Sequence, residues 1–110
     1  MQEKNERRRH FRLRFPLKER ATLSVDGMTL EVYEVSESGL RLAMDKPVKF
    51  KSNLIKGDLC LADGTVLKVK GTVFRKEKNT IVLANVDGLS FKHLMQEQMR
   101  LLRKYPMLSF

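Results

Sequence analysis

The sequence predicts an all-β domain with a C-terminal helix, namely a six-stranded antiparallel β-barrel capped by one α-helix. Two observations lead to this prediction. Between residues 19 and 86, apolar and polar residues alternate in short runs separated by turn-forming residues, a pattern typical of antiparallel strands. Beyond residue 90 the apolar residues recur at the spacing of a helix instead. A chain of 110 residues is long enough for one domain with a single core.

The first half contains three predicted strands. Segments 19–25, 28–35 and 39–44 each carry an apolar residue at every second position, which predicts strands with one face on a core. Asp26–Gly27 separates the first two segments, and both residue types tolerate the positive φ of a two-residue hairpin turn. We therefore expect 19–25 and 28–35 to pair as a hairpin.

The second half repeats this scheme. Residues 57–62 form a short predicted strand, followed by an Asp-Gly turn, a long strand over 65–77 and a sixth strand over 80–86. Gly71 lies in the middle of the long strand, where a glycine predicts a bulge or a sharp bend of the sheet.

A helix is predicted over about residues 90–105. Ser90 is a suitable N-cap and Pro106 ends the pattern. The following residues lie at helical spacing and are expected to pack on the barrel: Phe91, Leu94, Met95, Gln98, Leu101, Leu102 and Tyr105. Basic residues gather in the last turns, where they interact favourably with the helix dipole: Arg100, Arg103 and Lys104.

The chain is strongly basic, and the excess is concentrated near its start. It has 22 Lys and Arg against 13 Asp and Glu, which gives a net charge of +9. Residues 4–20 hold eight basic and two acidic side chains. Such a balance predicts an anionic partner: nucleic acid, a nucleotide or a membrane surface. We therefore divide the chain into a basic arm, residues 1–17, that is mobile without ligand, and a barrel with its helix, residues 18–110.

Several classes of site are excluded by composition. Cys60 is the single cysteine and cannot form an internal disulfide, and His10 and His93 lie too far apart in the sequence to suggest a metal site. Neither an acid–base pair nor a nucleophile with its base can be assembled from these residues, so no catalytic function is predicted. The sequence contains no apolar run of about 18 residues that would span a membrane, and we expect a cytoplasmic protein.

Two short motifs combine groups that suit a ligand with guanine and phosphate. Arg8 and Arg12 form an RxxxR pair, and guanidinium groups bind phosphate oxygens and the O6/N7 edge of guanine bidentately. In the segment EVSESG, the carboxylate of Glu34 could accept from the other edge of guanine and the hydroxyl of Ser36 could bond beside it. Gly39 would allow a close approach of the backbone.

These motifs, in this order and ahead of a six-stranded barrel with a C-terminal helix, resemble the PilZ domain family, bacterial modules that bind cyclic di-GMP. The resemblance covers nearly the whole chain and implies a PilZ-like barrel. Glu34 stands where the family usually has Asp or Asn, so its carboxylate reaches one methylene further. The ligand-binding residues implied by the resemblance and by the basic cluster are Arg7, Arg8, Arg9, Arg12, Glu34, Ser36 and Gly39.

The function implied by the resemblance is a single-domain cyclic di-GMP receptor that needs no cofactor. Binding would order the arginine arm and create a surface for an unknown partner protein. In the family, a basic residue directly before RxxxR accompanies a stacked ligand dimer, and Arg7 holds that place.

Two alternatives remain open. One is a degenerate PilZ-like interaction module that has lost the ligand, a hypothesis that Glu34 supports. The other is a basic nucleic-acid-binding barrel, which the lack of Trp and the core-phase positions of most Phe residues disfavour.

Overall fold

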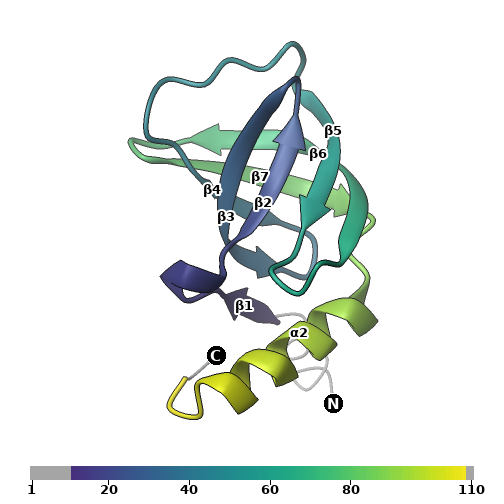
Figure 1. The fold of residues 1–110 in the computed structure, drawn as a ribbon. Coiled ribbons are helices and arrows are strands. Elements are labelled where there is room, and N and C mark those ends of the chain that lie inside the picture. Colours follow the sequence, from purple (N-terminus) through teal and green to yellow (C-terminus); the bar gives the residue numbers. More distant parts are fainter. Residues whose placement is uncertain (1–10, 109–110) are drawn as a thin grey trace, which may run out of the picture.

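In the computed structural model, seven antiparallel strands and one α-helix follow one another within residues 11–108, the part of the chain that the structure describes (Figure 1). The elements are β1 (Arg12–Arg14), the 3-10 turn η1 (Leu17–Glu19), β2 (Ala21–Val25), β3 (Met28–Ser36), β4 (Leu40–Ala43), β5 (Leu54–Cys60), β6 (Val66–Lys76), β7 (Thr80–Asp87) and α2 (Phe91–Lys104).

Six of these strands close into a barrel. The strands neighbour one another in the order β1-β3-β2-β5-β6-β7-β4, and an additional pairing of β3 with β4 closes the ring. The predicted six-stranded antiparallel barrel with a C-terminal helix is therefore confirmed. The predicted hairpin turn between β2 and β3 is also present, with φ of 53° at Asp26 and 77° at Gly27.

The first strand lies outside this ring but within the sheet. β1 pairs with the end of β3 that β2 leaves free, so that Arg12 faces Ser36 and Arg14 faces Glu34. Its central residue, Leu13, is fully buried in the core. Within the described residues the sheet begins at Arg12, where Leu13 supplies an apolar side chain between two arginines, and the division of the chain at residue 17 stays a prediction.

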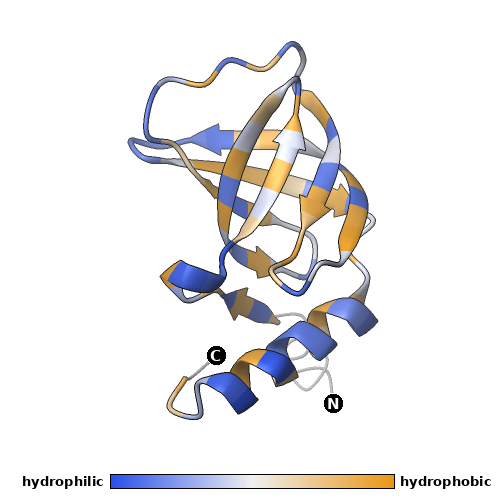
Figure 2. Cartoon of the chain, in the orientation of Figure 1, coloured by the Kyte–Doolittle hydropathy of each residue, from blue (hydrophilic) through white to orange (hydrophobic). Residues whose placement is uncertain are grey.

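The core lies inside the barrel and beneath α2. Apolar and polar positions alternate along the strands in Figure 2, as expected for strands with one buried face. The largest fully buried apolar side chains are Leu13, Leu23, Leu40, Leu42, Ile55, Leu59, Ile81, Leu83, Leu94, Leu101 and Val32.

The bulge predicted at Gly71 is confirmed, and the extra residue belongs to the neighbouring strand. Lys70 faces Asp87 and Thr72 faces Ala84, so the single residue Gly71 of β6 lies opposite two residues of β7. A Cβ at Gly71 would lie 2.7 Å from Val86 Cγ2. Glycine is thus required here by close approach, and its partner strand carries the bulge.

Helix α2 matches its prediction in length and buries the expected face, with Phe91 as the exception and Glu97 as an unexpected buried residue. Ser90 caps it by accepting from the His93 N–H, and Tyr105 ends it. The buried side chains are Leu94, Glu97 and Leu101, with Glu97 fully inaccessible to solvent. Phe91, expected in the packing interface, is 57% exposed.

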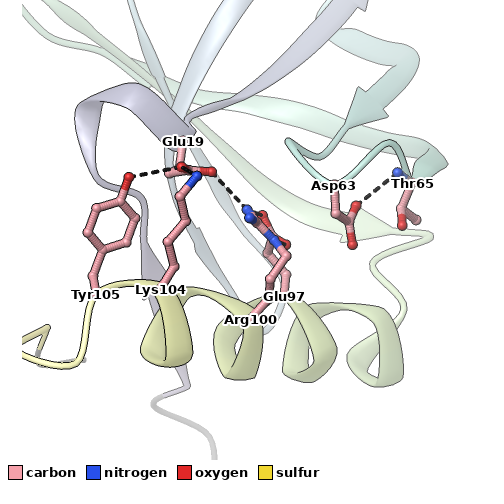
Figure 3. Close-up of polar contacts among 7 residues, drawn as sticks. All are labelled: Glu19, Asp63, Thr65, Glu97, Arg100, Lys104 and Tyr105. Atoms are coloured by element: carbon pink, nitrogen blue, oxygen red, sulfur yellow. Dashed lines mark hydrogen bonds and ion pairs between the residues drawn. The ribbon is translucent and has the colours of Figure 1, made fainter.

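A buried polar cluster joins α2 to η1 (Figure 3). Both oxygens of Glu19 are bonded, Oε1 by Arg100 at 2.9 Å and Oε2 by Lys104 at 2.7 Å and Tyr105 at 2.9 Å. Arg100 also binds Glu97 through Nε at 2.8 Å and Nη2 at 3.0 Å. We call these five residues the Glu19 cluster. The bonds from Lys104 and Arg100 lower the pKa of Glu19 to about 2. Arg100 and Lys104, which the sequence placed near a helix dipole, therefore have a carboxylate partner.

Candidate functional site

The motif residues that the structure describes, Arg12, Glu34, Ser36 and Gly39, meet on the outer face of the barrel, where β1, β3 and β4 run side by side. The strand register places Arg14 opposite Glu34, Glu34 opposite Arg41, and Arg41 opposite Val82 of β7. Residues directly opposite one another project from the same face of a sheet. Val35, the residue after Glu34 on β3, points into the core, and successive residues of a strand point to opposite faces. The row of Arg14, Glu34, Arg41 and Val82 therefore points outward.

Glu34 is the buried charge at the centre of this row. Arg12 Nη1 lies 3.1 Å from one carboxylate oxygen of Glu34 and Arg14 Nε lies 3.3 Å from the other. The side chain of Glu34 is only 6% exposed, whereas those of Arg12 and Arg14 are 54% and 72% exposed. Burial of a carboxylate is costly unless it is paired, and here both oxygens accept from guanidinium groups.

Ser36 and Gly39 form the turn that leads from β3 to β4. The Ser36 N–H donates to the carbonyl of Gly39 at 3.0 Å, and its hydroxyl donates to the same oxygen at 3.5 Å. A Cβ on Gly39 would lie 3.0 Å from the Leu83 carbonyl and 3.1 Å from Ser36 Oγ. The motif glycine therefore lets the turn pack closely on β7, where a side chain would make tight contacts.

Two adjoining depressions make this face concave. One, of about 110 Å³, is lined by Arg12, Glu34, Ser36, Gly39, Leu40, Arg41 and Val82. The other, of about 440 Å³, is lined by Arg12, Arg14, Tyr33, Glu34 and Arg41. Three guanidinium groups thus face one carboxylate, which leaves an excess of two positive charges among the described residues that line them. An anion of matching charge would be attracted here.

A larger groove elsewhere lacks this charge excess. It measures about 830 Å³ and crosses β2, β5 and β6. Its charged lining residues are Asp26, Lys56, Asp58, Lys68, Lys70 and Asp87, so three lysines are balanced by three aspartates. The groove is therefore electrostatically neutral, and the smaller arginine-lined depressions are the better candidate for an anionic ligand.

The structure brings together four of the seven predicted ligand-binding residues: Arg12, Glu34, Ser36 and Gly39. Arg7, Arg8 and Arg9 lie outside the described residues. Two lining residues, Arg14 and Arg41, were missed by the motif analysis. The sequence does carry a signal for them. Arg14 follows the buried Leu13, and Arg41 lies between the buried Leu40 and Leu42, so in a strand both arginines point outward.

Within residues 11–108, no group of three or more His, Cys, Asp or Glu side chains is arranged to hold a metal ion. The helix in this part of the chain is not long and apolar enough to cross a membrane.

Comparison with known proteins connects this geometry to a family. The model of the PilZ domain matches residues 6–106. Among solved structures, an uncharacterised protein of Legionella superposes with a TM-score of 0.59 at 22% identity, over 86% of this chain and 99% of that one. At this identity the likeness concerns the fold alone. A search of curated proteins found no match.

Proposed function

Because the chain belongs to the PilZ domain family, whose members are ligand-binding modules, we propose that it is a receptor for cyclic di-GMP that acts by binding. The observation that carries this proposal is the charge of the site. Arg12, Arg14 and Arg41 face the single carboxylate of Glu34 in a concave surface. Cyclic di-GMP has two phosphates, which match the excess of two positive charges.

In this proposal the two motifs bind different parts of the ligand. Arg8 and Arg12 bind phosphate oxygens and the O6/N7 edge of guanine. Ser36 bonds to the guanine beside the Gly39 turn, and Val82 offers an apolar surface below it. A direct contact between guanine and Glu34 requires that Arg12 or Arg14 first leave its carboxylate, because these side chains cover it.

The proposed response is an ordering of the segment that precedes β1. Ligand phosphates would draw its arginines onto the β1–β3–β4 face, and the rearranged surface would bind a partner protein. A second, stacked cyclic di-GMP would be accommodated by Arg7. The Glu19 cluster connects the turn after β1 to α2, so a change at β1 has a physical route to the helix.

Isothermal titration with cyclic di-GMP, GTP and a short single-stranded DNA tests this proposal. We expect saturable binding of cyclic di-GMP, and a loss of roughly 2–4 kcal/mol in each of Arg8→Ala and Arg12→Ala because a charge-assisted bidentate contact is removed. Arg103→Ala, which removes the same charge from an exposed position on α2, should bind as the wild type does. No binding of cyclic di-GMP by the wild type would contradict the proposal.

The dependence of affinity on salt concentration distinguishes a cyclic di-GMP receptor from a nucleic-acid-binding protein. Nonspecific binding of DNA through many basic groups falls steeply as salt rises, because each neutralised phosphate releases counterions. Cyclic di-GMP has only two phosphates and adds contacts to its bases, so its affinity should fall far less. A steep salt dependence together with tight DNA binding would favour the nucleic-acid-binding barrel.

One observation favours a second candidate function, a protein-interaction module without ligand. The carboxylate of Glu34 already bonds to Arg12 and Arg14, so the site is internally neutralised in part. If the wild type does not bind cyclic di-GMP but Glu34→Asp does, this second function is the better description.

A further inference from the structure

The carboxylate of Glu34 stands where a phosphate would be expected to bind. A carboxylate and a phosphate both present oxygen pairs that guanidinium groups bind in the same manner. Glu34 accepts from Arg12 at 3.1 Å and from Arg14 at 3.3 Å, and it is covered by them to 4% exposure. The two arginines are therefore already occupied by an anion that belongs to the protein.

A third arginine lies on the other side of the same carboxylate. Arg14 and Arg41 are the direct cross-strand neighbours of Glu34, one on β1 and one on β4. Arg41 lines both depressions. Within the part of the chain that the structure describes, it makes no ion pair.

From this arrangement, and on the basis of the proposed function, we propose that Glu34 is an internal counter-anion that competes with the ligand. A phosphate of cyclic di-GMP replaces the carboxylate of Glu34 as the partner of Arg12 and Arg14, and Arg41 is a further phosphate-binding residue outside the two motifs. Glu34 thus lowers the affinity of the site and keeps its arginines ordered when no ligand is bound.

The exposure of the arginines allows this exchange without unfolding. The side chains of Arg12 and Arg14 are more than half exposed, so their guanidinium groups can turn outward. The backbone of β1 stays in place because the buried Leu13 and its pairing with β3 hold it. Both oxygens of Glu34 accept from these guanidinium groups, so their outward movement frees the carboxylate oxygens.

The inference reverses an expectation from the sequence. If Glu34 accepted hydrogen bonds from guanine, Glu34→Gln would weaken binding, because the amide has one acceptor oxygen instead of two. If Glu34 is a competing anion, Glu34→Gln strengthens binding, because the substitution removes both the repulsion of phosphate and the competition for Arg12 and Arg14 while it keeps the side-chain shape.

The test is a titration of four variants with cyclic di-GMP at one salt concentration. We expect Glu34→Gln to lower Kd by fivefold or more, and Arg41→Ala to raise it by tenfold or more. Two matched controls should leave Kd within twofold: Glu31→Gln, on the outward face of β3 in an ion pair with Arg20, and Arg103→Ala. Thermal unfolding of each variant shows whether it has kept its fold.

The wild type supplies a second measurement that needs no variant. The Nε–H resonance of Arg14, bonded to Glu34 in the free protein, should shift on titration with cyclic di-GMP as its acceptor changes from carboxylate to phosphate. If the wild type binds but Glu34→Gln weakens binding or leaves it unchanged, or if the Arg14 resonance does not move, the counter-anion role is overturned while the proposed function stands. Absence of binding in both the wild type and Glu34→Gln would overturn the proposed function itself.

Discussion

Glu19 and Arg100 are 81 residues apart in the sequence and are joined by an ion pair of 2.9 Å. Glu19 ends η1, directly after the strand that carries Arg12 and Arg14, and Arg100 lies in the last half of α2. The side chain of Glu19 is buried, with an exposed fraction of 7%. The helix is thus held by a polar contact as well as by Leu94 and Leu101.

Glu19→Gln should destabilise the fold. The substitution replaces the enclosed carboxylate, to which Arg100, Lys104 and Tyr105 donate, by a neutral amide, and the loss of such charge-assisted hydrogen bonds costs roughly 2–4 kcal/mol. Urea unfolding monitored by circular dichroism measures this loss. Glu77→Gln is the control, because its pair with Arg75 is half-exposed on both sides and should contribute less than about 1 kcal/mol. Equal losses in the two variants would show that the cluster adds no stability.

Acid should remove the contribution of Glu19 over a defined range of pH. Its pKa is about 2 in the folded protein, against an ordinary value of 4.5, chiefly because Lys104 and then Arg100 donate to it. A carboxyl whose pKa is lowered by folding adds stability that is fully present above pH 4.5 and is lost as pH falls towards 2. We expect the free energy of unfolding to fall in that range by on the order of 1–2 kcal/mol more in the wild type than in Glu19→Gln. Parallel curves for the two proteins would contradict this.

Two glycines with nearly the same φ should respond differently to alanine. Gly64 and Gly88 have φ of 97° and 96°, a region that residues with a side chain rarely adopt, so alanine strains the backbone at both. A Cβ at Gly64 meets nothing within 4 Å, whereas at Gly88 it would collide with the carbonyl of Lys68. Gly64→Ala should cost about 1 kcal/mol and Gly88→Ala at least twice as much. Thermal unfolding measures both, and similar costs would mean that the backbone near Lys68 yields easily.

Removal of the Ser36 hydroxyl should weaken cyclic di-GMP binding by about 1 kcal/mol, the usual value for one neutral hydrogen bond. Ser38→Ala is the matched control, since Ser38 is exposed in the same turn and only its backbone carbonyl is used, as an acceptor from Val86. Isothermal titration of both variants makes the comparison. A loss in Ser38→Ala as large as that in Ser36→Ala would assign the effect to the turn and not to the hydroxyl.

The elements that could be predicted are those whose pattern is local. The Asp26–Gly27 turn and the Ser90 cap each follow from a few adjacent residues. β1 was not predicted because it has only three residues, two of which are arginines. One apolar residue, Leu13, is too few to show the alternation of a strand. The Glu19 cluster could not be found, since its partners are more than 80 residues distant.

The same distinction applies to the site. The spacing of Glu34, Ser36 and Gly39 is visible in the sequence, and their meeting with Arg12 follows once β1 joins β3. The alternation of Leu40, Arg41 and Leu42 places Arg41 outward, but its position beside Glu34 follows from the register of β4 against β3, which the sequence analysis did not work out. The ion pairs of Glu34 were likewise unforeseen, because they depend on a strand that the sequence did not predict.

The alternation within β1 has a consequence for insertions and deletions. Leu13 lies in the core while Arg12 and Arg14 face the candidate site, so residues that are adjacent in the sequence serve the core and the site in turn. Gain or loss of one residue between β1 and η1 would either turn an arginine inward or move η1 away from α2. An insertion of two residues keeps the faces, whereas a deletion of two would remove Phe15 and Pro16, and Phe15 is buried in the core. The segment should therefore tolerate an insertion of two residues better than an insertion of one, and a deletion of two should destabilise the fold.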